Sequence, residues 1–342
     1  MNLPHPGPGS NPDLPRRQLI LSSAAALASS MLSAHAQPAQ FADRPIKLVV
    51  PTAVGGGNDT TGRIYAEKVT SLLKRPVLVE NLPGANGLLG ARAVRAAKPD
   101  GHTLLWSSSS FTVFAPIADA WQFDPLREFR MVARVIGFEL MLLVTPSLGV
   151  RTLKEMLARL RSERLPWGNS GMTTTPNIAA TMFNEMAGGK GIGVPYPGSA
   201  PALNALLGGH IAFMFNSLEN AKGLIDAGKV IPLATLSKER TPGMENVPTM
   251  AEAGFPDIMS VAPWEFWYGA QAPVGVPNEL VMSLNDALYQ VSEDPATRDR
   301  FQKQGLRVLP RNSPADVDRI VRQEVEQYRS LIKKVIEINA AR

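Results

Sequence analysis

The sequence predicts an α/β fold with two domains, each built on a mixed, mostly parallel sheet flanked by helices. Its 342 residues exceed what one hydrophobic core usually supports, so two domains are expected. From Asp43 onward, short β-rich runs alternate with helical patterns, and a second series of the same kind begins near Phe138. This alternation is typical of sheets whose strands are joined through helices.

The first series contains strands and helices separated by Gly, Pro, Asn and Ser residues, which mark turns. We expect strands at 46–51, 76–81 and 102–107, with helices at 61–74 and 87–97.

The second series repeats this pattern and leads into a helical C-terminal part. The expected strands are 139–146, 166–171, 192–198, 211–217 and 230–237, and the expected helices are 152–163, 175–188 and 199–209. An extended aromatic segment, 263–273, then returns toward the first series. It is followed by helices at 278–293, at 295–305 and from Pro314 onward.

The last helix is strongly specified by its sequence. Ser313 is placed to act as N-cap, Pro314 fits the first helical position, and Asp316 takes the place of the capping-box acid. Apolar residues then recur at spacings of three and four, which predicts one buried stripe: Val317, Ile320, Val321, Val325, Tyr328, Leu331, Ile332 and Val335. We expect this stripe to pack on the first domain.

Composition excludes several classes of protein. The net charge is +5, but the basic residues are scattered and no run of five Lys or Arg occurs, so nucleic-acid binding is not expected. The chain has no cysteine, which rules out disulfides, a catalytic thiol, thiolate metal ligands and a lipidated cysteine. No cofactor or metal is expected.

The first 36 residues have the features of an export signal. Arg16 and Arg17 precede a weakly apolar, Ser/Ala-rich segment that ends in "AHA", which places cleavage after Ala36. Paired arginines favour the twin-arginine route, with the general secretory route as the alternative. No later stretch has the ~18 to 20 apolar residues of a membrane span. The mature protein is expected to be free in the periplasm.

The stretch "VVPTAVGGGNDTTGR" at 49–63 places three glycines between a strand and a helix. It lacks the Lys of a phosphate-binding P-loop, and Thr60 stands where the dinucleotide fingerprint needs its third glycine. A helix start capped by Asn58 or Asp59 and facing a small anion, either a carboxylate or a phosphate, is one interpretation. A tight turn without a ligand is the other.

Similar loops recur at the ends of other strands. "NLPGANGLLG", "WSSSSF", "GNSGMTTTPN" and "PYPGSAPAL" all place glycines or small hydroxyl residues before a helix. A cleft between two α/β domains would bring such loops together, which predicts a site built from main-chain amides and hydroxyls.

The chain resembles the Bug family, the extracytoplasmic solute receptors of tripartite tricarboxylate transporters, over nearly its whole length after the signal. The resemblance lies in many motifs in the same order, among them "RPIKLVVPTAVGGGND", "PVLVENLPGANGLLGARAV", "KPDGHTLLWSSSS", "PYPGSAPALNALLGGHIAFMF", "VPTMAEAGFPD" and "WYGAQAPVGVP".

This resemblance implies a type II periplasmic-binding-protein fold, in which two domains joined by two crossover strands close on a small carboxylic acid. Domain 1 would comprise 42–137 and 263–342, and domain 2 would comprise 138–262. The ligand-binding residues would be Val54, Gly56, Gly57, Asn58, Asp59, Ser107, Ser108, Ser170, Gly171, Thr173, Thr174, Tyr196, Pro197, Gly198, Ser199 and Asn216.

The sequence departs from the usual family pattern at the expected site. Pro197 stands where a Lys is common, Asn216 where an Asp is common, and Pro176 and Asn177 replace a common His-Leu pair. These changes leave the identity of the acid open, although the missing Lys disfavours a tricarboxylate. The aromatic residues Trp264, Phe266, Trp267 and Tyr268 are expected to be core between the domains rather than a platform for the ligand, with both roles open for Trp267.

The resemblance further implies a monomer that hands its ligand to membrane transporter subunits, or alternatively presents it to a sensor protein. An enzyme on the same scaffold, such as a hydrolase or dehydratase, is the competing class. After the signal only His102 and His210 remain, both in turns that suggest exposure, and Met172 interrupts the G-x-S-x-G pattern of a nucleophile elbow. Catalysis is therefore not expected.

Overall fold

The structure is a computed structural model that describes residues 43–118, 123–169, 171 and 173–340, together with Met1. The chain separates into two units, 1–40 and 41–342, and the fold below is that of the second unit. The predicted cleavage site and the rest of the signal after Met1 lie outside the described residues. Within the described residues, no helix has the length and apolar character needed to span a membrane.

The first sheet has six strands in the order β11-β4-β10-β3-β1-β2. Its strands are β1 (Ile46–Val50), β2 (Val77–Asn81), β3 (Thr103–Ser108), β4 (Phe129–Phe138), β10 (Phe266–Pro273) and β11 (Arg307–Val308). We call the part of the chain built on this sheet domain 1.

The helices of domain 1 follow its strands. They are α2 (Gly57–Leu73), α3 (Leu88–Arg95), α4 (Ala115–Ile117), α5 (Pro125–Glu128), α10 (Asn278–Glu293), α11 (Pro295–Lys303) and α12 (Pro314–Ala340). Two short turns, the 3-10 turn η1 (Ala85–Gly87) and the π turn η2 (Ser110–Phe114), complete this part.

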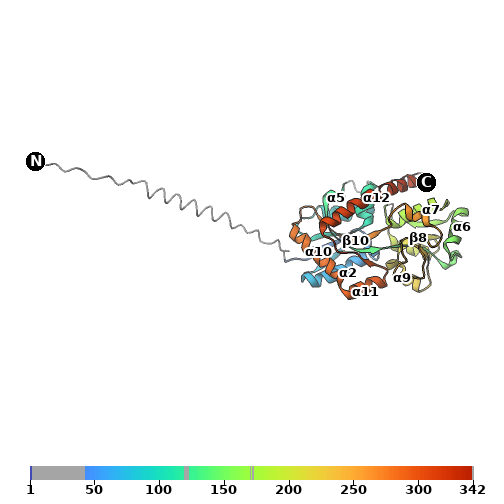
Figure 1. The fold of residues 1–342 in the computed structure, drawn as a ribbon, viewed down its shortest axis with the longest axis horizontal. Coiled ribbons are helices and arrows are strands. Elements are labelled where there is room, and N and C mark those ends of the chain that lie inside the picture. Colours follow the sequence, from blue (N-terminus) through green and yellow to red (C-terminus); the bar gives the residue numbers. More distant parts are fainter. Residues whose placement is uncertain (2–42, 119–122, 170, 172, 341–342) are drawn as a thin grey trace. The chain divides into compact units, whose positions relative to one another are not determined.

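The second sheet has five strands in the order β7-β6-β8-β5-β9 and forms the basis of domain 2. Its strands are β5 (Leu140–Val144), β6 (Pro166–Asn169), β7 (Ile192–Pro195), β8 (Phe213–Ser217) and β9 (Ile231–Thr235). Its helices are α6 (Leu153–Ser162), α7 (Thr175–Met186), α8 (Ser199–Leu207) and α9 (Leu218–Asp226), with the 3-10 turns η3 (Pro146–Leu148) and η4 (Pro256–Ser260). Figure 1 shows α6, α7 and α9 gathered around β8, and α2, α10 and α12 around β10.

The two sheets are joined where β4 ends and β10 begins. Only Glu139 separates the last residue of β4 from the first residue of β5, and Phe138 pairs with Phe266 at the start of β10. The chain therefore passes between the sheets twice at neighbouring positions, as the resemblance implied.

Both sheets are mixed, as expected, but parallel pairing does not dominate. In the first sheet β1 pairs in parallel with β2 and β3, whereas the three pairings made by β10 and β11 are antiparallel. In the second sheet two pairings are parallel and two are antiparallel. In each sheet, the first strand after a crossing, β10 or β5, runs against both of its neighbours, and in the first sheet the edge strand β11 also runs against β4.

Helix α12 confirms the predicted cap and stripe. Asp316 N donates to Ser313 Oγ at 3.2 Å, and every residue of the stripe is buried except Ile320, which is half-buried. The helix packs on β4 and η2 of domain 1, and it also contacts α7 of domain 2. The prediction of packing on the first domain was therefore right but incomplete.

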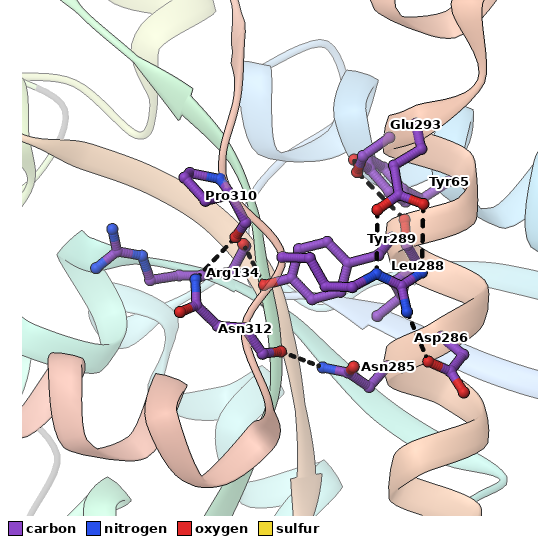
Figure 2. A network of polar contacts seen from close by, with 11 residues as sticks. Tyr65, Arg134, Asn285, Asp286, Leu288, Tyr289, Glu293, Pro310 and Asn312 are labelled. Carbon is purple, nitrogen blue, oxygen red and sulfur yellow. Dashed lines mark hydrogen bonds and ion pairs between the residues drawn. The ribbon is translucent and has the colours of Figure 1, made fainter.

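Polar contacts hold the segment before α12 in place (Figure 2). Asn285 Nδ2 of α10 donates to Asn312 O at 3.1 Å, and Tyr289 Oη donates to Arg134 O of β4 at 3.1 Å. These contacts connect α10 to β4 and to the segment that leads into α12.

Candidate functional site

A cavity of about 580 Å³ lies between the two domains. Domain 1 contributes the loop between β1 and α2, the loop after β2, the end of β3 and its π turn, and Tyr268 of β10. Domain 2 contributes the starts of α7 and α8, the end of β8 and the first turn of α9. The strand-end loops that the sequence singled out in both series are therefore gathered at one place.

On the domain 1 side, α2 begins at Gly57 with Gly56 as N-cap, and glycine has no side chain that could cap it. The expectation that Asn58 or Asp59 would be the N-cap is wrong, because the helix starts before them. Asn58 instead donates from Nδ2 to Trp106 O at 3.2 Å. The first amides of α2 are thus left for a ligand, because a helix start leaves its first N–H groups without partners inside the helix.

Asp59 holds the glycine loop from behind. Its Oδ2 accepts from Gly55 N at 3.0 Å and its Oδ1 accepts from Asn81 Nδ2 at 2.9 Å, while Arg63 lies 3.0 Å away. Burial alone would raise the pKa of Asp59, but the hydrogen bonds from Arg63, Gly55 and Asn81 outweigh it and lower that pKa. Asp59 is therefore an ionised carboxylate whose charge is balanced by Arg63 and whose hydrogen bonds hold the glycine loop in its conformation.

Three helices of domain 2 also begin at the cavity, and among the described residues none of them is capped by the side chain of its own N-cap residue. Their N-cap residues are Thr174 for α7, Gly198 for α8 and Ser217 for α9. The N-cap of α8 has φ 158° and ψ 173°, a region that favours glycine. Helix starts carry partial positive charge, so α2, α7, α8 and α9 together favour a negatively charged group in the cavity.

The side chains that line the cavity are neutral. Among its described lining residues there is no Lys, Arg, His, Asp or Glu. Asn216 offers a further donor, because its Nδ2 is buried without a hydrogen-bond partner among the described residues while its Oδ1 accepts from Ser217 N at 3.0 Å. A ligand here would be held by amides and hydroxyls rather than by ion pairs.

The two domains touch each other around the cavity. Thr175 N of α7 donates to Ser110 Oγ of domain 1 at 3.2 Å, and Tyr268 Oη of β10 donates to Glu219 Oε1 of α9 at 2.9 Å. The cavity is therefore bounded by contacts between the domains on more than one side.

Burial and their mutual contact shift the pKa values of Glu219 and Tyr268. Burial raises the pKa of Glu219, and the hydrogen bonds from Ser217 and Tyr268 only partly offset it. Burial, and after it the adjacent Glu219 carboxyl, raises the pKa of Tyr268 well above its usual value. Tyr268 therefore stays protonated and acts as the donor in this pair.

Most of the sequence-predicted residues lie on the cavity wall: Val54, Gly56, Gly57, Asn58, Ser108, Gly171, Thr174, Tyr196, Pro197, Gly198, Ser199 and Asn216. Three do not. Asp59 faces the back of its own loop, Ser107 Oγ hydrogen-bonds Thr112 Oγ1 at 2.9 Å inside the core, and Thr173 is buried ahead of α7. Ser170 lies outside the described residues.

Sequence reasoning missed several lining residues. Ser110 and Phe111 belong to the π turn after β3, and Asn220 belongs to α9, neither of which was predicted. Tyr268 was assigned to the core together with its aromatic neighbours. Trp264 and Trp267 are indeed buried, and Trp267 Nε1 donates to Glu324 Oε2 at 2.8 Å, away from the cavity. Strand alternation turns Tyr268 to the opposite face, which is a signal that could have found it.

The two histidines are not at the site. His210 is exposed as expected, but His102 is buried, with Nδ1 at 3.1 Å from Pro45 O, so the expectation that it is solvated was wrong. In the part of the chain that the structure describes, no group of three or more His, Asp or Glu side chains is arranged to hold a metal ion.

Two α/β domains joined at neighbouring crossovers, with a neutral cavity between them, define a two-domain solute-binding receptor. A sequence model of the family described as "Tripartite tricarboxylate transporter family receptor" matches residues 61–336. The chain belongs to this family.

Proteins similar to this chain in sequence and in structure agree with this assignment. Protein BugT of Bordetella pertussis is 28% identical over 316 residues, which cover 90% of this chain and 94% of the relative. The structure of MatC from Rhodopseudomonas palustris with bound malate matches with a TM-score of 0.79 and 28% identity, covering 85% of this chain and 100% of that one. A further R. palustris protein, solved with adipate, matches with a TM-score of 0.81 and 27% identity, covering 86% and 98%.

Proposed function

We propose that this protein is a periplasmic receptor that captures a small carboxylic acid between its two domains and delivers it to a tripartite tricarboxylate-type transporter. The observation that carries this proposal is the convergence on one cavity of helix starts from both domains, none capped by its own N-cap side chain, with no charged lining residue among those described. The malate and adipate bound by the two related structures are carboxylic acids, which supports the same ligand class here.

The ligand is held mainly by main-chain amides. The residues that we propose to contact it are those of the wall in the α2, α7 and α8 loops, with Asn216 Nδ2 as a side-chain donor. One helix terminus contributes only about 0.3 to 1 kcal/mol to an exposed anion, whereas micromolar affinity requires about 8 kcal/mol. Several termini, and exclusion of water as the domains close, are therefore needed together.

Closure follows from the position of the ligand. Domain 1 comprises 42–137 and 263–342 and domain 2 comprises 138–262, so the movable joints are the two crossovers beside Glu139 and Phe266. A ligand that contacts both domains stabilises the closed arrangement because it makes its full set of contacts only there. The closed receptor is then the form that the transporter subunits recognise.

No chemical step is part of this function. The lining residues include no paired base and nucleophile among those described, and the two histidines lie elsewhere. Export by the predicted signal, with cleavage after Ala36, would place the receptor in the periplasm, where it meets the ligand. We propose that it acts there as a monomer.

A thermal-shift panel of carboxylic acids tests the proposal. The purified protein is first unfolded and refolded to remove any bound metabolite. An acid at 100 times its dissociation constant should stabilise the protein by about 2.7 kcal/mol, and the primary amide of the same acid should not. If no acid in a panel of aliphatic and aromatic carboxylates stabilises the protein, or if acids and amides act equally, the proposal is wrong. Release of a changed product would instead identify an enzyme.

A further inference from the structure

Glu219 is an acidic residue that lies against two residues of the cavity wall, Gly57 and Tyr268. It lies in the first turn of α9, and its Oε1 accepts from Tyr268 Oη at 2.9 Å. A Cβ atom placed on Gly57 would come within 2.2 Å of the same Oε1. The carboxyl group of domain 2 therefore packs directly against the backbone where α2 of domain 1 begins.

The surroundings of Glu219 do not neutralise it. Its Oε2 is shielded from solvent, and Ser217, at the start of the same helix, offers the carboxyl group only a neutral hydroxyl donor. Of the neighbouring elements, β10 presents Tyr268, which is a neutral donor. On α2, Asp59 is paired with Arg63 at 3.0 Å, and on α9, Lys222 is paired with Asp226 at 2.8 Å.

This position matters because Glu219 and a bound anion would share the same positive helix start. The amides at the beginning of α2 favour one negative charge nearby. When Glu219 is ionised, it already draws on part of that stabilisation, and it repels each further negative charge that enters the cavity. No cationic side chain among the described lining residues is available to offset the repulsion.

Building on the proposed function, we propose that Glu219 is a specificity-determining residue that limits the negative charge of the ligand, so that the receptor favours an acid with one carboxylate over an acid of the same length with two. The apolar part of the wall, which includes Phe111, Phe138 and Leu140, suits the uncharged end of such an acid. When Glu219 is ionised, binding of the doubly charged acid would require it to take up a proton from solvent.

The protonation of Glu219 gives the selectivity a pH dependence. Burial raises its pKa, so the group changes charge at a higher pH than an exposed glutamate. Below that pKa the carboxyl is neutral and a second ligand charge is tolerated. Above it the carboxyl is ionised, and the preference for the singly charged acid becomes stronger.

Calorimetric titration with matched acids tests the inference. The pairs are butanoate with succinate, hexanoate with adipate, and octanoate with suberate, each measured over a pH range in which the acids are fully ionised. For the wild-type protein, the ratio of monocarboxylate to dicarboxylate affinity should rise with pH. The change Glu219→Gln, which keeps the shape and removes the charge, should lower that ratio about tenfold at the upper end of the range, which corresponds to about 1.4 kcal/mol, and should make it independent of pH.

Two further variants keep the test decisive. Glu67→Gln changes an exposed glutamate on α2 and should leave the ratio unchanged. Tyr268→Phe keeps the Glu219 carboxyl but removes its donor, so the pH at which the ratio rises should move upward even if overall affinity falls. A ratio that is unaffected by Glu219→Gln, in a variant that still folds and binds, would overturn the inference alone. Absence of binding of every acid to the wild-type protein would overturn the proposed function and this inference with it.

Discussion

Tyr268 and Glu219 join the two domains through a single hydrogen bond of 2.9 Å beside the cavity. Tyr268 belongs to β10 of the first sheet, and its ring stacks on Phe138 at 4.4 Å, where the chain crosses to the second sheet. Glu219 belongs to the helix that follows β8 of the second sheet. The contact thus lies where the crossovers, the start of α2 and the ligand cavity come together, and most of the expectations below concern its neighbours.

Gly57 is expected to be intolerant of any side chain. The added Cβ of Gly57→Ala would lie 2.2 Å from Glu219 Oε1 and 2.4 Å from Tyr268 Oη, so the side chains of Glu219 and Tyr268 would both have to move away from residue 57. Overpacking of this kind costs about 1 to 3 kcal/mol. Because Gly57 and Glu219 belong to different domains, this cost opposes their closure on the ligand, so calorimetry should show a loss of affinity of roughly tenfold or more. Gly223→Ala on α9 has nothing within 4 Å and serves as the control. Equal affinities for the two variants would mean that this contact is not needed for binding.

Asp59 is expected to matter more for stability than for affinity. Asp59→Ala removes the acceptor of Gly55 N and Asn81 Nδ2 and should lower the free energy of unfolding by about 1 to 2 kcal/mol. Because the folded state lowers the pKa of Asp59, its contribution is present above the ordinary Asp pKa and is lost as the pH falls. Denaturant titrations should therefore show wild type and variant converging at acidic pH. A loss of affinity larger than the loss of stability would instead place the carboxylate in contact with the ligand.

Gly198 is expected to be required at the start of α8. Val at this position would be strained at φ 158°, and it would place a branched side chain on the cavity wall at the start of α8. Gly209→Val, at the other end of α8, meets a comparable backbone penalty at φ 72° with open space around it. Both variants should lose about 1 to 3 kcal/mol of stability, but only Gly198→Val should also lose affinity for the acid. Unchanged affinity in a folded Gly198→Val protein would remove the start of α8 from the proposed site.

Glu139, between the two sheets, is expected to make the stability of the protein fall as the pH rises. Burial raises its pKa, and the contacts with Thr241 and Arg307 offset this only in part. The folded protein therefore binds this proton more tightly than the unfolded chain, and stability decreases between the ordinary Glu pKa and the higher pKa of the folded state. Glu139→Gln should be at least as stable as wild type at neutral pH and should lack this decrease, whereas the exposed Glu337→Gln should behave as wild type. Thermal unfolding across pH would contradict the account if Glu139→Gln kept the wild-type slope.

The sequence predicted those elements whose ends carry a local chemical signal. Apart from α9, the strands and helices from β1 to β3 and from β5 to β9 are bounded by Gly, Pro, Asn or Ser, and Ser313 and Pro314 mark the start of α12. Strand β4 was missed because nearly every one of its residues is buried, which hides the alternation of an exposed strand. Helix α9 was missed because it follows β8 directly, with no breaker between them.

The site was predicted in part for the same reason. Glycines and hydroxyl residues before α2, α7 and α8 are readable as helix starts near a ligand, and the structure brings these loops together. The contact of Glu219 with Gly57 and Tyr268 depends on how two sheets meet. No spacing along the chain encodes it, so sequence reasoning had no means of finding it.

The most direct test of the central claim is backbone amide NMR of deuterated, nitrogen-labelled protein titrated with the best acid from the thermal-shift panel. The claim is that amides at helix starts of both domains hold one carboxylic acid. The amide signals of Gly57 and Gly198 should both shift, with the same dissociation constant, and should stay in place when the primary amide of that acid is added. Saturable binding of the acid that leaves both signals unmoved, or that shifts the signal of one domain only, would contradict the account.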